Sequence, residues 1–413
     1  MNKQPTENRE INQPYLKHTG LIIFLALMNA FIPLSTDMYL PALPSMSAYF
    51  NSSSAITNLT LSSFFLFYAI GILFWGPLSD KFGRRRILLA GSVIYAISSI
   101  ACALSLNVYF LIGARILQGI GAGGITSVAM AIIKDSYSGK KRESILAVCQ
   151  AIAGLAPMLA PIIGSLLLHF ADWRGSFWVL AIISLINLVF SLLFKETLQD
   201  KDRYTGSLFG AVGRLFVVAK NKSFLLPGLI FSLSSLPFMG YIAVSSYIYV
   251  DYFGLSAQTY SIFFAANALL SLTGPFIYVK FLSNIDKKWF ATLTLSMATL
   301  SGIGVMTIGR TSPYLFWISF LLMSLSGTIV RPFSTNLLLN QQKGDTGSAA
   351  SLIGTLFTVL GSVGMSLASL PWADTVLGLG LIITCFSIFS LLAWNITVRS
   401  NLSIIGIDNE PNA

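Results

Sequence analysis

The chain has 413 residues, of which 54% are hydrophobic and only 10% are charged, and its formal net charge is +10. A soluble globular domain carries roughly 25% charged residues. The polar side chains are therefore too few to build a water-soluble surface, and the composition excludes a soluble enzyme or a soluble binding domain.

Apolar runs recur along the chain at near-regular spacing, and each has about 20 residues, enough to cross the hydrocarbon core of a bilayer as a helix. Barrel strands are excluded because they have about 10 residues of alternating polarity. Twelve transmembrane helices are predicted, centred in residues 21–43, 58–79, 87–106, 108–133, 144–169, 174–194, 224–248, 260–282, 289–309, 313–336, 347–370 and 373–397. The predicted fold class is an all-α membrane protein.

Lysine and arginine are concentrated in alternate loops. They precede the first span and follow every even-numbered span, whereas the opposite loops hold only Arg174 and Arg310. This asymmetry predicts that both termini are cytoplasmic. No nucleic-acid partner is expected, because the basic groups lie in short loops and not on one continuous face.

The longest connection between spans runs from Lys195 to Ser223 and divides the spans six and six. This is the internal duplication of the major transporter folds, and Gly274-Pro275 at the end of span eight echoes Gly76-Pro77 at the end of span two. The predicted organisation is a cytoplasmic tail (1–20), a six-helix bundle (21–195), a cytoplasmic loop (196–222) with a short amphipathic helix around 208–218, a second bundle (223–398) and a cytoplasmic tail (399–413).

Asp37 lies near the far end of the first span. A charged residue at such a position costs at least ~2.5–3.5 kcal/mol, and such residues are mostly functional. Arg115 in span four lies at a similar depth, about seven residues or ~10 Å below the external end. Its partners are expected to be Asp37, Gln118 one turn deeper, or a bound anion. We expect Asp37 to carry protons; the alternative is a permanent ion pair with Arg115, which would lock the acid in its charged form.

The loop after span two reads Gly76-Pro77-Leu78-Ser79-Asp80-Lys81-Phe82-Gly83-Arg84-Arg85-Arg86. In this loop, an acid can offset a helix dipole, a glycine permits a tight turn, and the arginines can pair with Asp135 at the cytoplasmic end of span four. Arg86 is expected to be only a topology anchor. The predicted cytoplasmic gate comprises Gly76, Asp80, Gly83, Arg84, Arg85 and Asp135.

This loop closely resembles the signature of the major facilitator superfamily. Together with residues 37–44 (DMYLPALP), 115–119 (RILQG) and 172–178 (DWRGSFW), and with 343–351 (KGDTGSAAS) in the second half, it makes the chain similar to the Bcr/CflA group of drug:proton antiporters. The resemblance implies two six-helix bundles, export of drugs or small metabolites driven by the proton gradient without a cofactor, and a monomer in the inner membrane of a bacterium, with the bilayer, protons and a small molecule as partners.

The resemblance also implies site residues. Gly154, Pro157, Pro161 and Gly164 in span five resemble the antiporter motif, which is held to seal one side of the pathway. Some multidrug members carry a second acid where this chain has Asn29, so the cargo is expected to be neutral or zwitterionic and the coupling to use one proton. The expected proton and substrate site comprises Asp37, Arg115, Gln118, Asn29 and Tyr39, and an adaptable apolar cavity is expected at Tyr241, Tyr247 and Phe263.

Two further patterns are interpreted more simply. Residues 119–124 (GIGAGG) satisfy a dinucleotide-binding pattern, but they lie inside span four and are expected to pack helices. Arg331 near the end of span ten is expected to snorkel or to act at a gate.

Nucleophile–base pairs and metal clusters are not recognised at membrane depth, so no enzyme is expected. The alternatives to export are a proton-coupled importer of a small metabolite on the same fold and a non-transporting membrane sensor.

Overall fold

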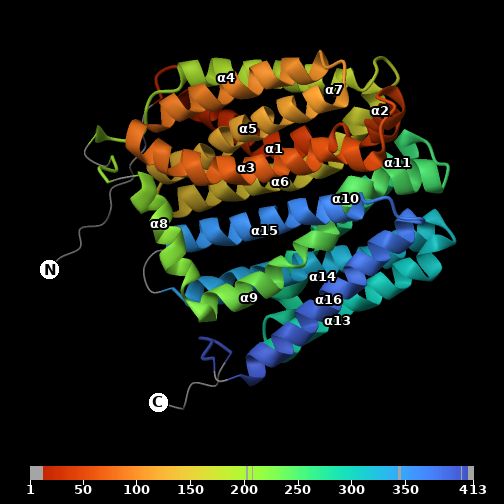
Figure 1. Cartoon of the computed structure of the whole chain (residues 1–413). Helices are drawn as coiled ribbons and strands as arrows, with labels where there is room; N and C mark the ends of the chain where they lie inside the picture. Colours follow the sequence, from red (N-terminus) through yellow and green to blue (C-terminus); the bar gives the residue numbers. More distant parts are fainter. Residues whose placement is uncertain (1–12, 201–202, 207, 343–345, 401, 408–413) are drawn as a thin grey trace. The chain divides into compact units, whose positions relative to one another are not determined.

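The computed structural model describes residues 13–200, 203–206, 208–342, 346–400 and 402–407, and these contain helices and no strand. The elements, in chain order, are α1 (Lys17–Asp37), η1 (Leu40–Ala42), α2 (Leu43–Tyr49), α3 (Ser54–Phe82), α4 (Arg84–Ala103), α5 (Val108–Ser136), α6 (Gly139–Leu167), α7 (Arg174–Leu193), α8 (Leu208–Ala219), α9 (Lys222–Ser232), α10 (Ser235–Tyr247), η3 (Ile248–Tyr252), α11 (Ala257–Ser271), α12 (Gly274–Ile277), η4 (Tyr278–Leu282), α13 (Lys287–Met306), η5 (Ile308–Arg310), α14 (Pro313–Asn340), α15 (Thr346–Ala368) and α16 (Thr375–Arg399). Figure 1 shows their course.

Twelve helical segments within the described residues are long and apolar enough to cross a membrane. Each contains the core of one predicted span, so the prediction of twelve transmembrane helices is confirmed. The short helix expected in the central loop is also present, as α8.

Three of the spans are interrupted four residues before a proline. Helix α1 ends at Asp37, four residues before Pro41; α9 gives way to α10 at Leu233, four before Pro237; α11 ends at Ser271, four before Pro275. A proline ring clashes with the carbonyl group of the residue four positions earlier. Asp37 therefore lies at a helix end because of the proline that follows it.

The chain divides into two compact units, one formed by Met1–Tyr39 and Phe67–Phe209, the other by Leu40–Leu66 and Gly210–Ala413. Residues 40–66 join the second unit through side chains: the Asn58 amide donates to Ser369 Oγ (2.8 Å), and Ser362 Oγ donates to the Ser62 carbonyl (2.9 Å). The bundle boundaries given above from the sequence stay a prediction.

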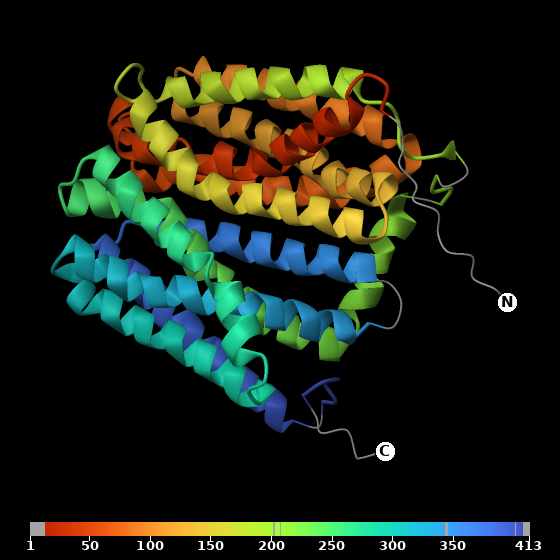
Figure 2. The same ribbon diagram turned by 180° about the vertical axis from the view of Figure 1, so that it is seen from behind.

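In the first unit, α4 packs against α5 and α7, and α1 packs against α6 (Figures 1 and 2; α6 is yellow in Figure 2). Glycines allow the closest approaches, because a Cβ at Gly121 would lie 2.7 Å from the backbone of α4 and a Cβ at Gly123 would lie 2.8 Å from the backbone of α3. The glycine-rich run of span four thus packs helices, as the sequence indicated.

In the second unit, α13 packs against α14 and α16, and α10 packs against α15. Figure 1 shows α13 and α16 side by side at one edge of this unit. Local side chains start several of these helices: Ser256 caps α11, Asp286 caps α13 and Asp374 caps α16 by accepting a backbone N–H. Such caps satisfy donors that have no partner inside the helix.

Candidate functional site

Asp37 is the last residue of α1, and its side chain is buried, with 5% of its surface exposed. Its carboxylate accepts a hydrogen bond from Thr36 Oγ1 (2.8 Å). Among the described residues Asp37 takes part in no ion pair. The structure therefore places the acid in a buried position without holding it in a salt bridge.

Arg115 lies in the middle of a polar network inside the first unit. It is fully buried, and its guanidinium donates to Gln118 Oε1 and to the Tyr39 hydroxyl (3.5 Å). The guanidinium carbon lies 4.8 Å from the centre of the Tyr39 ring. Gln118 Nε2 donates in turn to Ser99 Oγ (2.8 Å) on α4. Three predicted site residues, Arg115, Gln118 and Tyr39, are thus brought together, and Tyr39 follows Asp37 by two residues.

Asn29 takes no part in this network. Its amide nitrogen donates to the Leu25 carbonyl of its own helix (2.8 Å), and the side chain is half-buried. Since the donor is satisfied within α1, the structure gives Asn29 no contact with the other predicted site residues.

The glycine–proline motif of α6 packs against the end of α1. Gly164 faces the carbonyl oxygen of Met38, and a Cβ built at this glycine would overlap that oxygen. Pro161 is buried one turn earlier, whereas Gly154 and Pro157 are half-buried. The motif thus makes a backbone-to-backbone contact at the residue next to Asp37.

The predicted gate centres on Arg84, the first residue of α4. Its side chain is buried, and Arg84 Nε lies 2.9 Å from Asp135 Oδ2. The same guanidinium donates to Ser79 Oγ (2.7 Å) and to Asp80 Oδ1. The predicted pairing of an arginine with Asp135 is confirmed, and Gly76 is an open position at which a Cβ would meet nothing within 4 Å.

Glu196 contacts the predicted gate, and the sequence interpretation missed it. Its two carboxylate oxygens accept the backbone N–H groups of Arg84 and Arg85, each at 3.0 Å, so the acid caps α4 from the far end of the unit's sequence. Gly83 has φ +98°, and any Cβ there would lie 2.5 Å from Glu196 Oε2. The signal available in the sequence was a lone acid directly after span six.

The end of α7 and the central loop each make one more contact with the predicted gate. The Arg85 guanidinium donates to the Leu192 carbonyl (2.7 Å), and the Tyr204 N–H donates to the Asp80 carbonyl (2.9 Å). Leu192 and Tyr204 therefore hold the signature loop in place through their backbone groups.

The aromatic residues predicted to line a cavity separate into two places in the second unit. Tyr241 stacks on Phe320 with 3.8 Å between ring centres, and Phe263 stacks on Tyr249 at 4.9 Å; both belong to one cluster of packed rings on α10, η3, α11 and α14. Tyr247 instead bonds through its hydroxyl group to Ser47 Oγ (2.9 Å). The structure shows these side chains packed, and their role at a substrate cavity stays a prediction.

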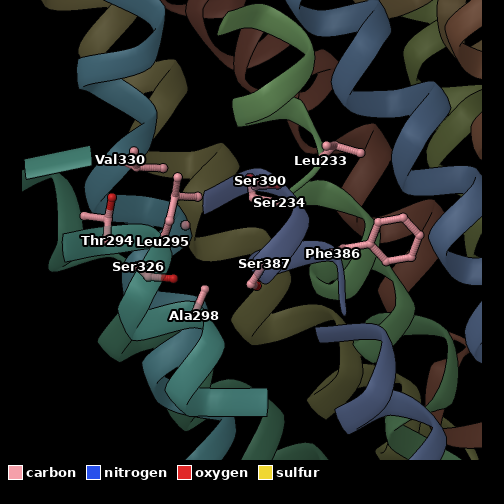
Figure 3. A pocket seen from close by; sticks show the side chains of 11 residues that line it. Leu233, Ser234, Thr294, Leu295, Ala298, Ser326, Val330, Phe386, Ser387 and Ser390 are labelled. Atoms are coloured by element: carbon pink, nitrogen blue, oxygen red, sulfur yellow. The ribbon is translucent and has the colours of Figure 1, made fainter. Parts of the chain in front are cut away.

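A small cavity lies where α9 gives way to α10. Its lining is mostly apolar, with hydroxyl groups from Ser234 at the junction and from Thr294, Ser326 and Ser387 on α13, α14 and α16 (Figure 3). Its volume is about 10 Å³, whereas drug-sized ligands need roughly 300–1,000 Å³. It has room for about one water molecule and is no substrate site.

Two predicted segments can be placed only in part. Residues 343–345 of the second-half motif lie outside the described residues, and α15 begins at Thr346. Arg331, expected to snorkel or gate, lies on α14 with its guanidinium carbon 4.6 Å from the centre of the Phe357 ring.

Comparison with known proteins agrees with this architecture. The pattern of the Major Facilitator Superfamily matches residues 25–365. The chain is 33% identical to the uncharacterized MFS-type transporter YdgK of Bacillus subtilis (86% of this chain, 89% of the relative) and 25% identical to a bicyclomycin resistance protein homolog of Haemophilus influenzae (93% and 98%).

Among solved structures, a mutant of the nucleoside transporter NupG is similar with a TM-score of 0.74 at 13% identity, covering 91% of this chain and 99% of that one. At this identity the likeness shows the fold alone. The relatives are transporters and not enzymes. The chain therefore belongs to the major facilitator superfamily, as a multi-pass membrane transporter similar to bicyclomycin-resistance proteins.

Proposed function

We propose that this transporter exports drugs or small amphipathic metabolites in exchange for protons. The observation that carries the proposal is Asp37, a buried acid without an ion pair among the described residues, at a helix end packed on the glycine–proline motif of α6. A buried carboxyl group that is not locked in a salt bridge can take up and release a proton without first breaking that bond. The drug-resistance name of one relative supports export.

In the proposed cycle, Asp37 is either protonated or engaged with cargo, but not both. A proton arriving from outside then displaces cargo outward, and loss of that proton to the cytoplasm resets the site. Arg115 holds Gln118 and Tyr39 in place beside the acid, and it supplies a positive charge that the deprotonated carboxylate can approach in another conformation. No cofactor is needed, because the proton gradient supplies the energy.

The Arg84 cluster is proposed to hold the cytoplasmic gate. Arg84 joins α3, α4 and α5 through Asp80, Asp135 and the backbone-bound Glu196. Opening of the transport pathway on the cytoplasmic side would require α3, α4 and α5 to move together, or the ion pairs of Arg84 to break. The charge asymmetry of the loops supports the orientation, with both termini cytoplasmic, and we further propose a monomer in the inner membrane of a bacterium.

The proposed function is tested with a matched pair of variants, Asp37→Asn and Asp172→Asn. Both exchange carboxylate for amide, but Asp172 is an exposed acid paired with Arg174 at 2.8 Å. A drug-susceptibility panel of expressing cells identifies a compound to which the wild type gives resistance. We expect Asp37→Asn to abolish resistance and substrate-induced proton release, and Asp172→Asn to keep both.

Proton-coupled export by the Asp37→Asn protein would overturn the assignment of Asp37. Import is the second candidate, on the same fold. Counterflow in inside-out and right-side-out vesicles separates the two: export predicts uphill accumulation in inside-out vesicles when their lumen is acidified, and import predicts the opposite dependence.

A further inference from the structure

Arg331 carries a charge within the last part of a membrane span. It lies on α14 about nine residues before Asn340, or ~13 Å from that end at 1.5 Å per residue. Because α14 has 28 residues, or ~42 Å, and the hydrocarbon core is about 30 Å thick, Arg331 lies roughly 7 Å inside the core when the helix is centred in it. A charge at this depth is costly and needs a functional or structural reason.

The side chain is exposed, yet it does not lie on the lipid face of its helix. The exposed apolar residues Tyr314, Ile318 and Leu322 form a stripe that marks the side of α14 facing the bilayer. Arg331 is about nine residues beyond Leu322, which at ~100° per residue places it half a turn away, on the opposite side. Its exposed surface therefore lies on the side of α14 away from the lipid-facing stripe.

The guanidinium is stacked but otherwise unengaged. Its carbon lies 4.6 Å from the centre of the Phe357 ring on the neighbouring helix α15. In the part of the chain that the structure describes, its nitrogens make no hydrogen bond and no ion pair. Stacking on a ring fixes the plane of a guanidinium and leaves its five in-plane donors available.

Other arginines of the chain, unlike Arg331, form ion pairs with acidic side chains. Arg84 is paired with Asp80 and Asp135, and Arg310 is paired with Asp374 at 2.8 Å. A guanidinium whose plane is fixed by a ring and whose donors are unused is suited to bind an anionic ligand group.

We propose that Arg331, oriented by Phe357, is a substrate-contacting residue that recognises a carboxylate or another planar anionic group on the transported molecule. The substrate class is then an amphipathic anion or zwitterion. This rests on the proposed transport function, and it adds to it a specificity determinant in the second half of the chain that is separate from the proton carrier Asp37.

The test uses 1-pyrenebutyrate, a fluorescent amphipathic carboxylate, and its uncharged methyl ester as probes for the purified full-length protein. The wild type is expected to bind the carboxylate about ten-fold more tightly than the ester, the weight of one charge-assisted hydrogen bond. Arg331→Gln should remove this preference by weakening carboxylate binding alone. Arg399→Gln, at the exposed end of α16, is the matched control and should leave both affinities unchanged.

Phe357→Leu keeps the charge and removes the stacking surface, so it should weaken carboxylate binding partially; it also keeps the test decisive if Arg331→Gln does not fold. Equal binding of the two probes to the wild type, no carboxylate binding, or a preference that survives both variants would overturn the proposal. Proton-coupled flux of the panel compound, measured beside Asp37→Asn, tests the proposed function separately, because it does not depend on the preference for an anion.

Discussion

Gly164 is the residue at which the contact between α6 and α1 leaves no space. A Cβ there would overlap the carbonyl oxygen of Met38, and neither backbone can retreat without moving a whole helix. We therefore expect Gly164→Ala to lower the melting temperature of the detergent-solubilised protein by roughly 1–4 °C, since overpacking costs ~1–3 kcal/mol.

Gly113→Ala in α5 is the control for this substitution. It is an exposed helical glycine at which a Cβ would meet nothing within 4 Å, so alanine should be neutral or slightly stabilising there. If Gly164→Ala melts with the wild type, the close approach of α6 to α1 is wrong.

At the residue scale, the sequence predicted the ion pair of Arg84 but not the contacts made with backbone groups. The pairing of Arg84 with Asp135 could be predicted because opposite charges at the same end of the bundle attract each other. Glu196 escapes such reasoning because its partners are N–H groups, which every residue except proline carries. The hydrogen bond from Arg115 to Tyr39 could not be predicted either, because Tyr39 lies just beyond the point where α1 ends.

At the scale of elements, α4 starts in an unusual way. Most helices with a cap here use a residue next to their own first turn, but α4 receives its cap from Glu196, 112 residues after Arg84. A carboxylate at the positive end of a helix adds a favourable charge to its two hydrogen bonds. The start of α4, and with it the position of Arg84, depends on the segment after span six.

We expect Glu196→Gln to weaken this cap by about 1 kcal/mol and so to lower both the melting temperature and the transport rate. Glutamine retains one acceptor oxygen and loses the charge. Glu143→Gln makes the same exchange at an exposed side chain on α6 and should change neither. A Glu196→Gln protein with wild-type stability and transport would show that the cap does not position the gate.

Helix interruptions could be predicted only in part. Pro41, Pro237 and Pro275 each break a span, whereas Pro33, Pro77 and Pro332 lie inside continuous helices. The two matching pairs therefore differ in structure: Gly76-Pro77 lies within a continuous helix, whereas Gly274-Pro275 follows a break in its span. Whether a proline breaks a helix depends on what satisfies the freed carbonyl group, and that is decided by neighbouring helices that a sequence does not show.

At the scale of the whole molecule, charge determines what can drive transport. One proton moving inward against one neutral molecule moving outward transfers one positive charge. An inside-negative potential of ~100 mV then contributes ~2.3 kcal/mol, which supports about a 50-fold concentration ratio of substrate. An anionic substrate leaving the cell adds a second charge, so the same potential should act on it twice as strongly in free energy.

We therefore expect a potassium diffusion potential set with valinomycin, at equal pH on both sides, to drive uphill flux of a neutral panel compound in proteoliposomes. The Asp37→Asn protein should not respond, because it cannot return a proton, and Asp172→Asn should respond like the wild type. Flux that follows a pH gradient but ignores the potential would contradict exchange of one proton for one neutral molecule. It would then require cargo that carries one positive charge out of the cell for each proton that enters.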